Sequence, residues 1–122
     1  MADTPRLQQA TSEQLIEAQE SGTIIIDIRR EDEWASTGII AGAKTITAFT
    51  ETGQLHADFH THFANIVPSE SAKIMLYCRS GQRTKALGNA LITQLGYTQV
   101  SHLSKGIMGW MGNGFDTTPY QP

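Results

Sequence analysis

The sequence has almost no cysteine: Cys78 is the only one among its 122 residues. A lone cysteine excludes an intramolecular disulfide. It also means that the chain has no second thiol that could cleave a mixed disulfide formed on Cys78. Any group that Cys78 acquires must therefore leave to an acceptor outside the chain.

Long apolar runs and an excess of basic residues are also missing. No run approaches the length that spans a bilayer, and the polar residues 1–10 lack the apolar segment of a secretion signal. We therefore expect a cytoplasmic protein that neither crosses nor binds a membrane. With 9 basic and 12 acidic residues, the formal charge of −3 argues against nucleic-acid binding.

The length and the hydrophobic content of 39% suit one domain over residues 1–122. We expect its core at about 11–112, a tail with little structure at 113–122, and a monomer. Hydrophobic periodicity and turn residues predict helices at 12–20, 29–36, within 51–66, between the Cys78 loop and Gly96, and at 106–111. Strands are predicted at 23–28, at 74–77 and at 100–103, and the glycine-punctuated segment 39–46 leads into another short strand. This alternation indicates an α/β domain with a mostly parallel sheet, whose ligands bind beyond the carboxyl ends of the strands.

The only cysteine lies where a predicted strand ends and a predicted helix begins. A helix start offers N–H groups without intrahelical partners, so it stabilises an anion, here the thiolate of Cys78. Ser80 and Gly81 allow the backbone to turn its amides inward. Positive charge is added by Arg79, Arg83 and Lys85. A lone cysteine is more often an inert buried residue, but this loop predicts a reactive thiol.

The spacing within this loop distinguishes two families that it resembles. Protein tyrosine phosphatases and their dual-specificity relatives have one residue more between cysteine and arginine, in a loop sized for a phosphate. Here four residues separate Cys78 from Arg83, and Cys-x-x-Gly-x-Arg-Thr resembles the active loop of rhodanese-type sulfurtransferases.

Two further motifs agree with the rhodanese family. Asp27-Ile28-Arg29, Glu33-Trp34 and Gly38-Ile39-Ile40-Ala41-Gly42-Ala43 are similar to its Asp-x-Arg, Glu-aromatic and Gly-His-Ile-x-Gly-Ala signature. Leu103-Ser104-Lys105-Gly106-Ile107 and Trp110 are similar to its Leu-x-Gly-Gly-x-x-x-Trp close. Ile39 replaces the usual histidine, and Lys105 replaces the first glycine of the close. The resemblance implies a three-layer α/β/α domain with a mainly parallel, five-stranded sheet.

The same resemblance implies sulfane-sulfur transfer without a cofactor or a metal. The Cys78 thiolate attacks a small anionic donor, thiosulfate or polysulfide, and the resulting persulfide passes its sulfur to cyanide or a thiol. We expect the sulfur to be held by the Thr84 hydroxyl and by the backbone amides of Arg79, Ser80, Gly81, Gln82, Arg83 and Thr84. Arg79 and Lys85 are candidates for attracting the donor and stabilising the leaving sulfite.

Arg83 is predicted to brace the loop rather than to bind substrate. Its guanidinium suits a bidentate bond to a carboxylate, from either Asp27 or Glu33. Asp27, Arg29 and Glu33 are expected to form one polar network beneath the edge of the sheet.

The remaining residues with potential chemistry have simpler interpretations. His56, His60 and His62 lack a cysteine or carboxylate partner for a metal and are predicted on the surface, and His102 is a strand residue. Trp34 and Trp110 are predicted in the core, together with Met75, Met108 and Met111. Two other functions stay open: a persulfide carrier or regulatory module that serves a protein partner, and a small cysteine phosphatase or arsenate reductase.

Overall fold

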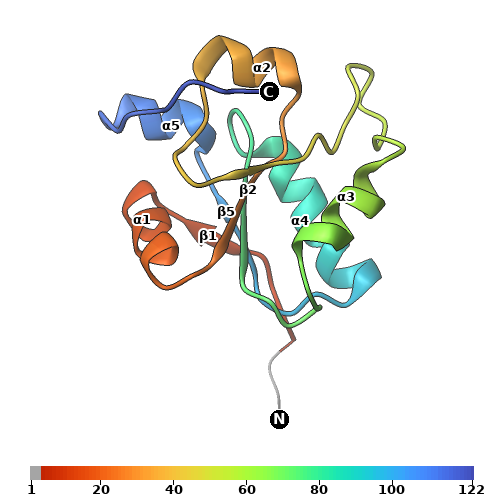
Figure 1. The fold of residues 1–122 in the computed structure, drawn as a ribbon. Coiled ribbons are helices and arrows are strands. Elements are labelled where there is room, and N and C mark those ends of the chain that lie inside the picture. The colour runs from red at the N-terminus through yellow and green to blue at the C-terminus, as the bar shows by residue number, and fades with distance from the viewer. Residues whose placement is uncertain (1–3) are drawn as a thin grey trace.

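The computed structural model describes residues 4–122, and its strands and helices alternate along the whole chain (Figure 1). The elements are β1 (Gln8–Ala10), α1 (Ser12–Glu20), β2 (Ile24–Asp27), α2 (Glu31–Thr37), β3 (Lys44–Thr45), α3 (Phe59–Ile66), β4 (Ile74–Tyr77), α4 (Gln82–Leu95), β5 (Val100–Leu103) and α5 (Gly106–Gly112). Within residues 4–122, no helix combines the length and apolar composition that a membrane crossing needs.

The five strands form one sheet in the order β1-β5-β4-β2-β3, and every neighbouring pair runs parallel. The α/β class with a five-stranded parallel sheet is therefore confirmed. In the pairing of the inner strands β2 and β4, Asp27 lies opposite Tyr77. Because parallel strands end at a common edge, the loop that follows Tyr77 leaves the sheet beside the end of β2.

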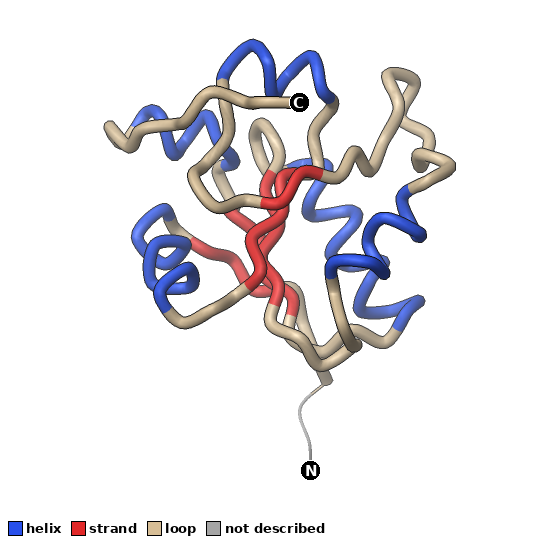
Figure 2. Tube along the Cα trace, viewed as in Figure 1, coloured by secondary structure: helices blue, strands red, loops and turns tan. Residues whose placement is uncertain are grey.

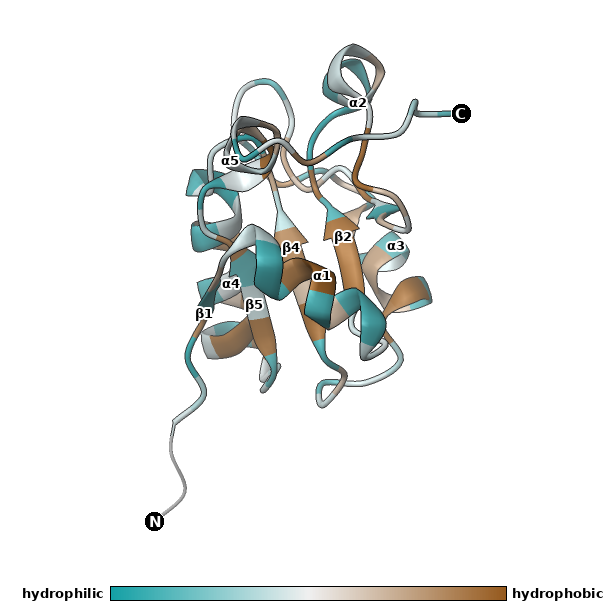
Figure 3. Cartoon of the chain, turned by 90° about the vertical axis from the view of Figure 1, so that its left-hand side faces the viewer, coloured by the Kyte–Doolittle hydropathy of each residue, from teal (hydrophilic) through white to brown (hydrophobic). Residues whose placement is uncertain are grey.

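Helices cover both faces of the sheet, which confirms the three layers (Figure 2). In Figure 1, α1 and α5 lie on one face, and α3 and α4 lie on the other. The first face buries Leu15, Ile107 and Trp110 against the sheet, and the second buries Phe59, Phe63, Leu87 and Leu91. The inner strands β2 and β4 are among the most hydrophobic segments in Figure 3. Because helices cover both faces of these strands, side chains on either face must be apolar. This explains the β-branched run in β2.

The C-terminal segment 113–122 is attached beside α2 at the carboxyl edge of the sheet (Figure 1). Ile39 and Thr118 exchange two backbone hydrogen bonds of 2.8 and 2.7 Å. The Trp110 indole donates to the Asp116 carbonyl at 2.9 Å, and the rings of Trp34 and Tyr120 lie 5.1 Å apart. The segment contains no helix or regular strand, but these contacts fix it to the domain.

The predicted helical pattern within 51–66 extends over too many residues. The helix begins at Phe59, because a turn precedes it: Thr50 donates to the Gln54 carbonyl at 2.8 Å, and Gly53 has a φ of +85°. This turn sets Phe49 against Leu55 in an antiparallel bridge. Leu55 consequently lies 45% exposed instead of on a buried helical face.

Other local signals are found where the sequence predicts them. The Thr11 hydroxyl accepts from the Gln14 amide at 3.1 Å, and the Gln14 side chain accepts from the Thr11 amide at 2.8 Å, which starts α1 with a capping box. Gly96 ends α4 in the left-handed conformation. No pattern marks β1, because this edge strand pairs only with β5 and buries only Ala10.

Candidate active site

The loop after β4 folds back over the sulfur of Cys78. Cys78 is 1% exposed, and the backbone N–H of Gly81 donates to its Sγ at 3.2 Å. Gly81 has a φ of +99°, which turns its amide inward and places it at the N-cap of α4. The sulfur therefore lies under a turn of backbone at the start of a helix, where a negative charge is stabilised.

A second donor to the sulfur comes from the first turn of α4. The buried Thr84 hydroxyl lies 3.5 Å from Cys78 Sγ, and it also lies 3.2 Å from the Gly81 carbonyl. Of the donors that the sequence offers between Arg79 and Thr84, these two groups lie within hydrogen-bond distance of Sγ among the described residues. The side chains of Arg79, Ser80 and Gln82 are exposed instead.

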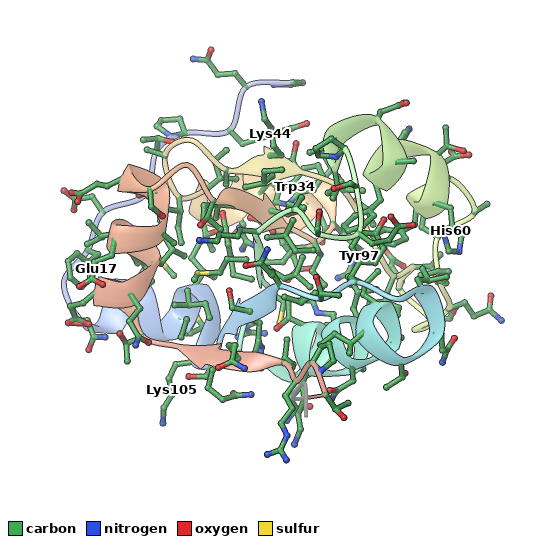
Figure 4. All side chains as sticks on the ribbon, turned by 90° about the horizontal axis from the view of Figure 1, so that it is seen from below. Glu17, Trp34, Lys44, His60, Tyr97 and Lys105 are labelled. Carbon is green, nitrogen blue, oxygen red and sulfur yellow. The ribbon has the colours of Figure 1, made fainter. Side chains whose placement is uncertain are left out.

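Helix α5, which follows β5, holds the cysteine loop in place. Its amides at Ile107 and Met108 donate to the carbonyls of Cys78 and Arg79 at 2.9 and 3.1 Å. Gly106 has a φ of +64°, and a Cβ there would collide with the Arg79 carbonyl. Lys105, which departs from the family pattern, is exposed and extends away from the molecule (Figure 4). The closing motif thus holds the cysteine loop through its backbone, and a lysine at position 105 leaves that function intact.

Arg83 is tied to Glu33, one of the two carboxylates that the sequence offered. Its terminal nitrogens donate to the two carboxylate oxygens of Glu33 at 2.8 Å each, in a bidentate pair between α4 and α2. Burial alone would raise the pKa of Glu33, but the hydrogen bonds and charges of Arg83 and Arg30 outweigh it and lower that pKa. The hydrogen bonds that Arg83 donates to Glu33 likewise raise the pKa of Arg83. Both groups stay charged near neutral pH, and the guanidinium points at α2.

Asp27 and Arg29 form a separate buried cluster. Arg29 donates to the Asp27 carboxylate at 2.8 Å, to the Gly38 carbonyl at 2.9 Å and to the Thr37 hydroxyl at 2.9 Å. The expected single network of Asp27, Arg29 and Glu33 is thus divided. The Glu33 side chain turns to Arg83, and only its backbone carbonyl accepts a hydrogen bond from Thr37. The buried pair fixes the turn from β2 into α2, and that turn positions Glu33 for Arg83.

Arg79 and Lys85 supply the free positive charge of the site. Both are exposed, and within residues 4–122 neither side chain has an ion-pair partner. Arg79 also lines a pocket of about 390 Å³ beside the loop. The other lining residues of this pocket are Arg29, Arg30, Asp32, Glu33, Ser36, Thr37, Ile107 and Met108.

Met108 is the methionine whose predicted place is wrong. It is 48% exposed at the pocket, whereas Met75 is buried and Met111 half-buried as core residues. The reason is its position on α5: the neighbouring Ile107 takes the side that faces the sheet. An apolar side chain therefore lies exposed beside Arg79.

His102 is the site residue that the sequence did not reveal. Its ring is 2% exposed, with Nδ1 2.7 Å from the Thr84 hydroxyl and Nε2 2.9 Å from Gln9 Oε1. Burial and the charge of Lys85 lower the pKa of His102. The available signal was its place in a predicted strand between the apolar residues Val100 and Leu103, because a buried imidazole requires hydrogen-bond partners.

The remaining polar regions lie apart from this chemistry. His60 and His62 are exposed and His56 half-buried, and within 4–122 no three potential ligands gather as a metal site would require. A larger hollow of about 1410 Å³ lies between α1, β1 and the amino ends of β4 and β5. Its lining contains neither cysteine nor histidine, so it offers no nucleophile comparable with Cys78.

Together, these contacts define a class of protein: a parallel α/β domain, covered on both faces, that holds one cysteine in an anion-stabilising loop at the carboxyl edge of its sheet. The family model of the Rhodanese-like domain matches residues 11–113. The chain therefore belongs to the rhodanese-like family, as its three motifs predict.

Known relatives and structures agree with this assignment. An uncharacterized protein of Rickettsia conorii is 31% identical over 86 residues, which are 70% of this chain and 69% of that protein. The thiosulfate sulfurtransferase of Pseudomonas aeruginosa superposes with a TM-score of 0.75 at 19% identity, over 94% of this chain and 21% of that chain. A Rhodopseudomonas palustris protein described as a possible tyrosine phosphatase superposes with a TM-score of 0.67 at 21% identity, over 92% of this chain and 85% of that chain. These structural similarities show a shared fold.

Proposed function

We propose that this chain is a sulfurtransferase that moves a sulfane sulfur from thiosulfate or polysulfide, through a persulfide on Cys78, to a thiol or cyanide. The observation that carries the proposal is the setting of the sulfur. Cys78 Sγ lies 3.2 Å from the Gly81 nitrogen and 3.5 Å from the Thr84 hydroxyl, at the start of α4. The thiolate and the persulfide are both anions, and such donors stabilise the negative charge of each.

The chemical step needs one nucleophile and no resident oxidant. The Cys78 thiolate attacks the outer sulfur of thiosulfate, an S–S bond forms at Sγ, and sulfite leaves with the electron pair of the broken bond. Cyanide or a thiolate then attacks the outer sulfur of the persulfide and releases the Cys78 thiolate. Because the chain has one cysteine, the acceptor comes from outside.

The charges around the loop support an anionic donor. Arg79 and Lys85 are exposed without ion-pair partners in the part of the chain that the structure describes. They attract thiosulfate or polysulfide and offset the charge of the departing sulfite. Arg83 takes no part in this, since both of its terminal nitrogens are bound to Glu33.

The same ion pair argues against a phosphatase, although one structural neighbour is described as a possible tyrosine phosphatase. A phosphatase loop uses its arginine to hold phosphate oxygens, whereas Arg83 is bound to Glu33. With four residues between Cys78 and Arg83, the loop is also one residue short of the phosphatase spacing.

A protein acceptor is the variant of this function that Met108 favours. In this variant the protein surface that docks beside Arg79 covers the exposed Met108 side chain, which a small anion leaves in water. In this variant the Cys78 persulfide is the same, and only the acceptor differs.

Steady-state kinetics test the proposal. Thiosulfate and polysulfide are supplied as donors, and cyanide, a small thiol and candidate carrier proteins as acceptors, with Cys78→Ser as the inactive reference. We expect sulfur transfer that requires Cys78, and faster turnover with a protein than with cyanide would identify a carrier. Hydrolysis of an aryl phosphate without any sulfur transfer would replace the proposal with the phosphatase.

A further inference from the structure

A chain of hydrogen-bonded side chains leads from the Cys78 sulfur to the edge strand β1. Thr84 Oγ1 lies 3.5 Å from Sγ and 2.7 Å from Nδ1 of His102. Nε2 of His102 lies 2.9 Å from Oε1 of Gln9, its partner in the β1–β5 pairing. Cys78, Thr84 and His102 are buried, so water does not compete for the contacts among them, whereas Gln9 is exposed. The sulfur-transfer steps above leave His102 without a role.

These hydrogen-bonded side chains have fewer protons than acceptors. The Thr84 hydroxyl has one proton, and three acceptors compete for it: Sγ, the Gly81 carbonyl and Nδ1 of His102. Gln9 Oε1 accepts from Nε2, so a neutral ring has its proton on Nε2 and a bare Nδ1. The 2.7 Å contact then has Thr84 donating to His102, and the Cys78 thiol donates to Thr84.

Protonation of Nδ1 reverses both hydrogen bonds. His102 then donates to Thr84 Oγ1, and the hydroxyl turns its proton toward a sulfur anion. We propose that His102 is a positioning residue that takes up, through the Thr84 hydroxyl, the proton that Cys78 gives up on becoming a thiolate. The thiol proton moves to Thr84 Oγ1 while the Thr84 proton moves to Nδ1, so no heavy-atom bond changes and no electron is transferred.

The surroundings of the ring keep it neutral before the transfer. Of the titratable groups near His102, Lys85 of α4 acts on the ring through its charge, and Cys78 lies on the far side of the Thr84 hydroxyl, whereas β1 contributes the neutral Gln9. Burial and Lys85 lower the pKa of His102, so the ring is neutral at neutral pH and Nδ1 is free to accept. The thiolate that this transfer produces is separated from the new imidazolium cation by the Thr84 hydroxyl, and the two opposite charges stabilise each other.

Replacing Gln9 by glutamate tests the relay from its exposed end. A carboxylate beside Nε2 favours the imidazolium and raises the pH at which His102 titrates, which NMR of its ring protons measures. If the relay operates, the ultraviolet absorbance of the Cys78 thiolate moves to lower pH, and the thiolate fraction at a fixed pH below the midpoint rises about fivefold. Gln8→Glu is the matched control, because it adds the same charge to the opposite face of β1.

The variant Thr84→Val, which keeps the shape of the side chain, separates the relay from simple charge effects. In Gln9→Glu/Thr84→Val the thiolate midpoint should lose the shift that Gln9→Glu causes alone. The proposal is overturned if Gln9→Glu moves the His102 titration but not the thiolate midpoint, or if the full shift persists without the Thr84 hydroxyl. The inference rests on the proposed function for its role in turnover, but these titrations use no sulfur donor. A negative result here therefore leaves sulfur transfer untouched, and inactivity toward donors leaves the titrations valid.

Discussion

Replacing Glu33 by glutamine tests whether the Arg83–Glu33 pair holds the cysteine loop. The change keeps the size of the side chain but removes the charge that receives two 2.8 Å hydrogen bonds from Arg83. Arg83 is then left partly buried without its counter-charge. We expect a loss of stability and, because Arg83 precedes Thr84, a displaced donor to the sulfur.

The magnitude follows from the exposure of the pair. The Arg83 and Glu33 side chains are 26% and 15% exposed, between a surface pair and a buried one. Breaking a surface pair costs at most about 1 kcal/mol and breaking a buried pair about 3–5 kcal/mol, so we expect about 2 kcal/mol here. A displaced Thr84 hydroxyl should slow persulfide formation about tenfold.

Urea unfolding and the rate of persulfide formation measure the two effects. Glu31→Gln is the matched control, since it removes the same charge from the same turn of α2 at an exposed position and should change stability by less than about 0.5 kcal/mol. If the two side chains stabilise the protein as a unit, Glu33→Gln/Arg83→Met should cost little more than either single change. Additive losses, or a Glu33→Gln variant as stable as the control, would refute the reasoning.

Three other changes have defined outcomes. Arg79→Ala should raise the KM for thiosulfate about tenfold without altering the unfolding free energy, because its side chain is exposed without an ion-pair partner within 4–122; unchanged kinetics would exclude it from donor binding. Gly106→Ala should cost more than about 2 kcal/mol in urea unfolding, because φ is +64° and the new Cβ meets the Arg79 carbonyl, whereas Gly112→Ala, with open space around it, should not destabilise; equal effects would contradict the clamp. Acid should lower the free energy of unfolding through Glu33, whose pKa is lower in the folded state than in the unfolded chain. The stabilisation from Glu33 is complete above the ordinary pKa of 4.5 and is lost as pH falls through the folded-state pKa. The stability difference between the wild type and Glu33→Gln should therefore shrink below that pH, and a constant difference would argue against the pair.

Local patterns were sufficient for most of the fold. Strand β4 is a run of apolar residues buried on both faces, and Thr11 and Gly96 are strong end signals for α1 and α4. The edge strand β1 lacked such a pattern, because it shows one buried residue and depends on pairing with β5. Its presence followed only from the family resemblance, which implied a fifth strand without placing it.

The site was predictable where neighbouring residues in the sequence determine it. The loop from Cys78 to Thr84 is local, and its glycine and threonine approach the sulfur as expected. Contacts between residues far apart in the sequence were harder to predict. Sequence offered Asp27 and Glu33 equally to Arg83, and the choice depends on the Asp27 carboxylate already being bound by Arg29. His102 was missed for the same reason, since its partners Thr84 and Gln9 lie on other elements.

The most direct test of the central claim is the intact mass of the protein after brief incubation with thiosulfate or polysulfide. We predict a gain of one sulfur atom that disappears on adding cyanide or a thiol and that is absent from Cys78→Ser. An unchanged mass with both donors, in a folded protein whose Cys78 still reacts with an alkylating agent, would contradict a persulfide mechanism.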